Sequence, residues 1–148
     1  MEFIKAEEFL KQPIEVQKVF TDWWKNNIQK YDLFYRKLND NRQKYVVTKA
    51  NACDISTITL RSSNEQIDIE DWDIEFIESI IPLLVEGQMR RFIEDKTHQI
   101  TIIEFDDGHY NIVQRLGKAY ITDQKELLKA YWQVALGIAK ECVENGRA

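Results

Sequence analysis

The sequence predicts an α+β fold in which one antiparallel β-sheet is combined with N-terminal helices, a middle helical pair and a long C-terminal helix. Apolar residues recur at helical spacing near both ends of the chain and after its midpoint. Residues 32–60 and 98–121 are instead rich in alternating β-branched and aromatic residues, which is typical of strands. The 148 residues fit a single domain over 1–148, and such a domain buries roughly 70% of its extended-chain surface, so it needs neither a disulfide nor a metal to fold.

The first 27 residues predict two amphipathic helices. The first covers residues 3–11, and the second begins at Pro13, with Gln12 at its cap, and ends at about Asn27. The apolar positions of the second helix recur at i, i+3, i+4 and i+7 and are Val16, Val19, Phe20 and Trp23, with Trp24 beside them. This bulk predicts core packing, and the alternative is a partner-binding patch.

The next segment predicts a hairpin followed by a third strand. Residues 32–36 and 44–48 form the hairpin strands around turn-forming residues 38–42, and residues 55–60 alternate as a strand. Helical spacing then returns after Asp71. Pro82 breaks any helix that reaches it, so we expect separate helical segments over 73–80 and 84–95, with Glu86 at the N-terminus of the second.

Residues 98–122 predict a second hairpin. Its turn is Asp106-Asp107-Gly108-His109, in which an Asp-Gly pair favours a type I′ turn. The resulting register pairs Phe105 with Tyr110, Ile103 with Ile112 and Ile102 with Val113. Because both faces carry apolar residues, we expect part of this sheet to be covered on both sides. A third short strand follows at 119–121.

The C-terminal segment predicts the longest helix, over residues 124–144. Asp123 and Glu126 match a capping box at its start, and Asn145-Gly146 ends it. Apolar residues cover more than half of its circumference, which is typical of a central element or of an oligomer interface.

Charge is distributed unevenly along the chain. The net charge is −5, yet residues 62–89 hold eight acidic residues and no Lys or Arg. An acidic chain disfavours direct nucleic-acid binding, which needs a basic face. No apolar run is long enough to span a membrane, the N-terminus does not have the pattern of a signal peptide, and Cys53 and Cys142 form no disulfide framework. We therefore expect a cytoplasmic protein with reduced thiols.

The strongest candidate for a binding surface is the acidic segment, which we define as residues 65–78. Unpaired carboxylates repel one another and would steer a positively charged protein surface toward the segment, with Trp72 as an anchor. The alternative interpretation is a solvated face without a partner. The candidate partner-binding residues are Glu65, Asp68, Glu70, Asp71, Trp72, Asp73, Glu75 and Glu78.

Motifs for catalysis or for cofactor binding are weak. The histidines and cysteines lack the short spacing of zinc sites, and the EF-hand pattern fails because Asp73 stands where a Gly is needed. We therefore expect no metal, no cofactor and no catalytic residue. The alternative is a metal-dependent enzyme that uses Glu104, Asp106, Asp107 and His109, whose carboxylates and imidazole suit metal binding or general-base work.

Three segments resemble small uncharacterised proteins that are common in phages and prophages of Gram-positive bacteria. They are VQKVFTDWWK followed by YDLFYR (16–36), IPLLVEGQMRRFIEDK (81–96) and ELLKAYWQVALGIAKE (126–141). The acidic segment and residues 49–69 are not part of this resemblance. The resemblance implies a phage accessory protein, a class that includes inhibitors of host defence such as anti-CRISPR proteins.

These observations favour a non-catalytic accessory protein that binds a basic protein surface of host or phage origin through the acidic segment, and that inhibits a nucleic-acid-binding or defence system of the host. Two alternatives stay open. One is the metal-dependent enzyme at residues 104–109. The other is a structural or virion-assembly protein that self-associates through the C-terminal helix.

Overall fold

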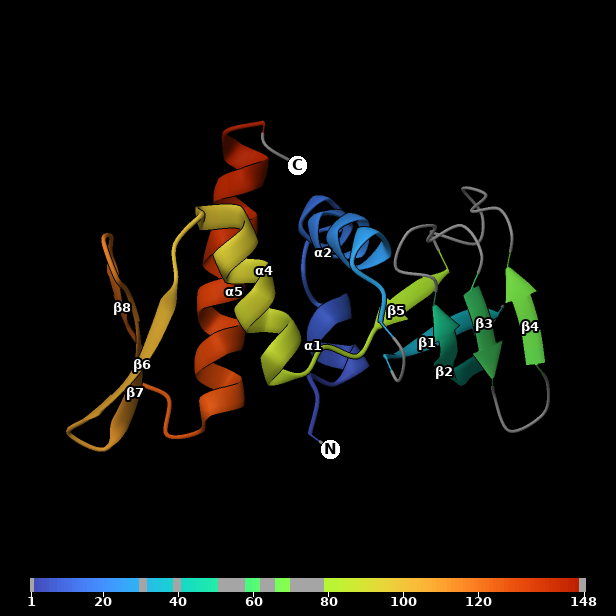
Figure 1. Ribbon diagram of the computed structural model, residues 1–148, viewed down its shortest axis with the longest axis horizontal. Coiled ribbons are helices and arrows are strands. Elements are labelled where there is room, and N and C mark those ends of the chain that lie inside the picture. The colour runs from blue at the N-terminus through green and yellow to red at the C-terminus, as the bar shows by residue number, and fades with distance from the viewer. Residues whose placement is uncertain are drawn as a thin grey trace. The chain divides into compact units, whose positions relative to one another are not determined.

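The computed structural model describes residues 2–29, 32–38, 41–50, 58–61, 66–69 and 79–146. These residues form helices and antiparallel sheets, which confirms the predicted α+β class (Figure 1). The chain divides into two compact units. Unit 1 consists of Met1–Ile4 and Leu84–Ala148, and unit 2 consists of Lys5–Leu83.

Unit 2 combines two helices with a five-stranded antiparallel sheet of order β4-β3-β2-β1-β5. Its elements are α1 (Ala6–Leu10), α2 (Ile14–Asn26), β1 (Leu33–Leu38), β2 (Asn41–Ala50), β3 (Ile58–Arg61), β4 (Gln66–Ile69) and β5 (Ile80–Pro82). The predicted core role of the second helix is confirmed, because all five of its large apolar residues named above are buried. Pro13 lies at the N-cap of α2 instead of inside its first turn.

Three aromatic rings bind the helix to the sheet in unit 2. The ring of Trp24, from α2, meets the ring of Phe34 edge-on, with centroids 5.2 Å apart. Phe34, from β1, stacks on Tyr45 of β2, with centroids 5.4 Å apart. Both Trp24 and Phe34 are completely buried, so these contacts remove large apolar surfaces from water.

Unit 1 contains two packed helices and a three-stranded antiparallel sheet of order β6-β7-β8. Its elements are α4 (Glu86–Thr97), β6 (Thr101–Asp106), β7 (His109–Gln114), β8 (Ala119–Ile121) and α5 (Leu127–Glu144). In Figure 1, α4 and α5 lie side by side, and α5 also packs on β7. The side chain of Gln88 accepts a hydrogen bond of 2.9 Å from the Val85 amide and so closes the N-terminus of α4.

The register of the second hairpin is confirmed. Phe105 pairs with Tyr110, Ile103 with Ile112, and Ile102 with Val113. Its turn residues Asp107 and Gly108 have φ values of 51° and 82°, as a type I′ turn requires. The Asp-Gly pair therefore sets which residues of β6 and β7 share a face.

Several predictions about the sheets are wrong. The strands form two separate sheets instead of one. β4 pairs with β3 and β5 pairs with β1, so both edges of the sheet formed by β1, β2 and β3 are occupied within unit 2. Residues 73–78 of the predicted helix over 73–80 lie outside the described residues, and its last residue, Ile80, belongs to β5. The prediction that part of the second sheet is covered on both sides holds for β7, where Asn111 and Ile112 lie on opposite faces and are both buried, whereas residues 102–106 of β6 are all exposed.

The C-terminal helix begins later than predicted. It starts at Leu127, and its N-cap, Glu126, makes no capping hydrogen bond through its side chain, so the predicted capping box with Asp123 is absent. The cause is the hairpin. The amide of Thr122 donates to the Asn111 side chain (3.2 Å), and the carbonyl of Gln124 accepts from the Tyr110 amide (2.9 Å). Residues 122–124 are thereby held beside β7 and do not join the helix.

Candidate protein-binding surfaces

The acidic segment is only partly described. Asp68 lies in β4, opposite Thr59, on the outermost strand of the five-stranded sheet. The other seven candidate residues lie outside the described residues: Glu65, Glu70, Asp71, Trp72, Asp73, Glu75 and Glu78. The structure therefore places one candidate on a sheet edge, and binding through the segment stays a prediction.

The tip of the second hairpin brings acidic residues close to a histidine. Asp106 lies directly opposite His109, and Nδ1 of His109 is buried without a hydrogen-bond partner in the described part of the chain. No group of three or more His, Cys, Asp or Glu side chains suited to a metal ion occurs among the described residues, so Glu104, Asp106, Asp107 and His109 do not assemble into one.

The apolar surface of α5 is largely buried within the chain. The buried residues are Ala130, Tyr131, Trp132, Val134, Ala135, Ile138, Ala139 and Cys142. Of the other apolar residues in its stripe, Leu127, Leu128 and Leu136 are half-buried, and Val143 is 37% exposed. This arrangement corresponds to the central element that the pattern predicts, and it leaves little apolar surface of α5 for self-association.

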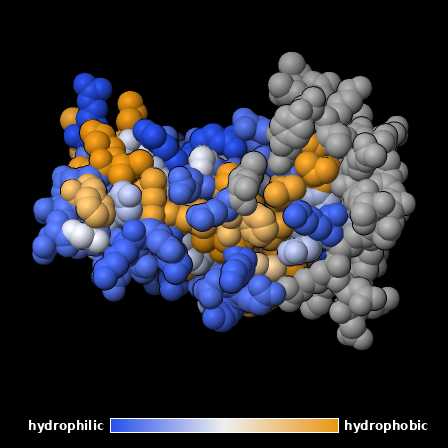
Figure 2. Space-filling model, turned by 90° about the horizontal axis from the view of Figure 1, so that it is seen from below, coloured by the Kyte–Doolittle hydropathy of each residue, from blue (hydrophilic) through white to orange (hydrophobic). Residues whose placement is uncertain are grey.

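The three-stranded sheet of unit 1 has an exposed apolar face, which we call the outer face. Its two most exposed apolar strand residues are Ile102 (51%) and Ile121 (73%), with Val113 between their strands. Figure 2 shows hydrophobic side chains at the surface of this part of unit 1. Apolar clusters of this kind mark interaction sites when they are contiguous.

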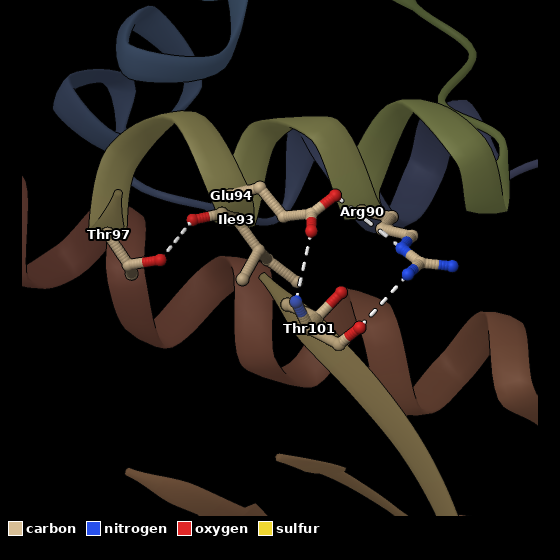
Figure 3. A network of polar contacts seen from close by, with 5 residues as sticks. All are labelled: Arg90, Ile93, Glu94, Thr97 and Thr101. Carbon is tan, nitrogen blue, oxygen red and sulfur yellow. Dashed lines mark hydrogen bonds and ion pairs between the residues drawn. The ribbon is translucent and has the colours of Figure 1, made fainter. Parts of the chain in front are cut away.

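Two side chains of α4 form hydrogen bonds with the backbone of Thr101, the first residue of β6 (Figure 3). The Glu94 carboxylate accepts a hydrogen bond of 3.0 Å from the Thr101 amide, and the Arg90 guanidinium donates one of 2.9 Å to the Thr101 carbonyl. Arg90 and Glu94 also form an ion pair of 3.5 Å along α4. We call Arg90 and Glu94 the α4 clamp. The clamp was not predicted, although an Arg and a Glu four residues apart before a strand are a signal visible in the sequence.

Tyr131 of α5 lies close to the charges of the α4 clamp. Burial raises the pKa of its phenol above the ordinary value of 10, Arg90 lowers it, and the carboxylates of Glu86 and Glu94 raise it. The phenol therefore stays protonated at neutral pH beside these charged side chains.

A polar hollow of about 630 Å³ lies within unit 1. It is lined by residues of α4, of the turn between β7 and β8, and of α5, among them His98, Gln114, Lys118 and Glu141. Lys118 and Glu141 form an ion pair of 3.7 Å across it. The hollow was not predicted, because its lining residues come from three stretches that are distant in the sequence, within 95–99, 114–120 and 138–142.

Comparisons with known proteins give no relative for this chain. No family model, no curated protein and no solved structure matches it. Among the helices of the described residues, none is long and apolar enough to cross a membrane.

Proposed function

We propose that this chain is a non-catalytic accessory protein of phage origin that binds a basic protein surface through the acidic segment. The observation that carries the proposal is the charge pattern, with eight acidic and no basic residues in 62–89. Charges without counterions raise the local negative potential and increase the rate of encounter with a positive surface.

The described residues add one supporting feature to the proposal. Asp68 lies on β4, at the edge of its sheet, where a partner can approach the strand from one side. The proposed partner is a host protein whose own basic groove binds nucleic acid, in the manner of inhibitors of host defence. The proposed location is the cytoplasm of the host cell.

A charge-reversal experiment tests the acidic segment. Glu70, Asp71, Asp73 and Glu75 are replaced together by Lys, and the variant is compared with wild type in a pull-down from the host followed by affinity measurement at low salt. We expect a loss of affinity of about tenfold or more, because each exposed charge pair contributes about 0.2–1 kcal/mol.

The matched control reverses four exposed carboxylates elsewhere, at Glu2, Glu8, Glu15 and Glu144. It gives the same change in net charge and should bind as wild type does. Equal affinity of the wild type and of the acidic-segment variant would contradict the proposal, and so would an equal loss in both variants.

A further inference from the structure

β6 is an edge strand with an open side. Among the strands of the described residues it pairs with β7 alone, in a sheet of order β6-β7-β8. The amide of Arg115 donates to the carbonyl of Ile100 (3.1 Å), which fixes the alternation of the ladder. Ile102 and Glu104 therefore direct their backbone groups toward β7, whereas Thr101, Ile103 and Phe105 direct theirs to the open side.

The α4 clamp covers only the first of these three residues. Its side chains take the place of a neighbouring strand at Thr101, where they satisfy both the amide and the carbonyl. No side chain of the described residues is found to bond the outward backbone groups of Ile103 or Phe105. The open side of β6 therefore offers a short row of hydrogen-bonding groups, which is a template for an added strand.

The side chains along this edge are exposed and apolar. Ile103 is 39% exposed, and Phe105 is 61% exposed although its ring touches that of Tyr110, with centroids 4.9 Å apart. Native edges are usually blunted by charged side chains, by Pro or by a bulge; the segment TIIEFD of β6 has no Pro, Lys or bulge, and its charged residues are Glu104 and Asp106. An incoming strand would cover these two side chains as well as the backbone.

A second copy of β6 fits this edge poorly. Antiparallel self-pairing centred on Ile103 would bring Phe105 opposite Thr101 of the other copy, whose outward groups the α4 clamp already occupies. Pairing centred on Glu104 would place that carboxylate opposite itself, and like charges directly opposite each other destabilise a sheet. The edge therefore selects against a copy of its own strand.

The charges on the edge select a basic partner instead. Glu104 and Asp106 are exposed on the outer face, and Asp107 follows in the turn. A residue paired with Ile103 or Phe105 lies on the same face as these apolar side chains, and the residue between them lies opposite Glu104. We propose that the edge of β6 is a strand-addition site for an extended protein segment in which apolar residues alternate with Lys or Arg. The site lies in unit 1 and does not use the acidic segment.

The test measures binding of a short, capped, fluorescently labelled peptide in which Val alternates with Lys. A peptide in which Val alternates with Glu is the charge control. Wild type should bind the first peptide and not the second. Ile103→Pro removes an outward N–H without removing a bond to β7, and it should weaken binding by about tenfold or more.

The opposite edge of the same sheet supplies the matched control variant. Ile121 of β8 is exposed on the other edge and also directs its backbone away from β7, so Ile121→Pro should bind as wild type does. Glu104→Lys should weaken binding of the Val–Lys peptide about two- to fivefold and strengthen that of the Val–Glu peptide. If circular dichroism shows that Ile103→Pro does not fold, the change in peptide preference caused by Glu104→Lys at its exposed position tests the proposal instead.

Three outcomes would overturn the inference. The first is that neither Ile103→Pro nor Glu104→Lys changes binding, or that Ile121→Pro changes it equally. The second is that the acidic-segment variant no longer binds the Val–Lys peptide whereas the β6 variants still bind it, which would place the peptide's binding site at the acidic segment. The third is a wild-type dimer in sedimentation that Ile103→Pro dissociates, because the occupant is then a second copy. If charge reversal in the acidic segment has no effect on partner binding, the β6 variants should still change peptide binding as predicted. The two proposals can therefore be contradicted separately.

Discussion

At the scale of single residues, the polar groups of β6 have different partners from one position to the next. Thr101 is paired by side chains of α4, whereas its neighbours alternate between β7 and the open edge. This alternation depends on one register, and the Asp-Gly turn fixes that register. The local sequence therefore decides which amides are protected.

Hydrogen exchange should reveal this pattern amide by amide. The amides of Ile102 and Glu104 are bonded to β7 and should exchange about a hundredfold more slowly than those of Ile103 and Phe105, because a bonded amide exchanges only when the strand opens. Exchange followed by NMR measures all four amides. The Val–Lys peptide should slow Ile103 and Phe105 selectively, and uniform rates along β6 would contradict the assigned register.

Tyr131 should make stability depend on pH in alkaline solution. Burial raises its pKa in the folded state above 10, so as pH rises the unfolded chain loses the phenol proton first and the free energy of unfolding falls. Urea unfolding at about pH 9 and about pH 11 measures the fall. In Tyr131→Phe the fall should be smaller. Equal losses in the two proteins would show that this phenol does not contribute.

At the scale of elements, the long periodic segments and the short strand β8 at 119–121 were predictable from the sequence, whereas the short strands β4 and β5 were not. The helices α2, α4 and α5 have apolar residues over three or more turns, and the hairpin of β6 and β7 has a strong turn signal. β5 has only three residues and contains Pro82, which reads as a helix breaker in the sequence. Its strand geometry depends on pairing with β1, and pairing between distant segments leaves no local pattern.

The candidate site was less predictable than the fold. The charge pattern predicted a binding surface in residues 65–78, and of these residues the structure describes only β4. β6 has an open edge because no strand of the described residues pairs with its side opposite β7. That property requires knowledge of the order of strands in the sheet, which the hairpin register alone does not supply.

Two glycines in unit 1 should respond in opposite ways to substitution by alanine. A Cβ at Gly137, on the exposed side of α5, meets nothing within 4 Å, so Gly137→Ala should raise the free energy of unfolding by about 0.5–1 kcal/mol. A Cβ at Gly117 would lie 2.8 Å from Oε1 of Gln114, which is buried and donates through its amide to Thr97 (2.6 Å). Gly117→Ala should therefore lower stability by about 1 kcal/mol.

Thermal and urea unfolding of both glycine variants measure these changes. The two substitutions are chemically identical, so each serves as the control of the other. A gain in both variants would mean that Gln114 shifts without losing its bond to Thr97.

At the scale of the whole molecule, the distribution of charge should govern how fast a partner binds. Since the acidic residues are concentrated in 62–89, the association rate with a basic partner should fall steeply as salt rises, and the dissociation rate should change much less. Surface plasmon resonance at about 0.05 M and about 0.5 M NaCl separates the two rates. An association rate that does not depend on salt would argue against steering by the acidic segment.

The division into two units also has a consequence for synthesis on the ribosome. The amide of Ile4 donates to the carbonyl of Leu84 (2.8 Å), so unit 1 joins the first residues of the chain to a segment that is translated only after all of unit 2. Lys5–Leu83 can pair its strands as soon as it leaves the exit tunnel. Ile4 has to wait for Leu84, so in a nascent chain stalled before that point the Ile4 amide would lack this partner.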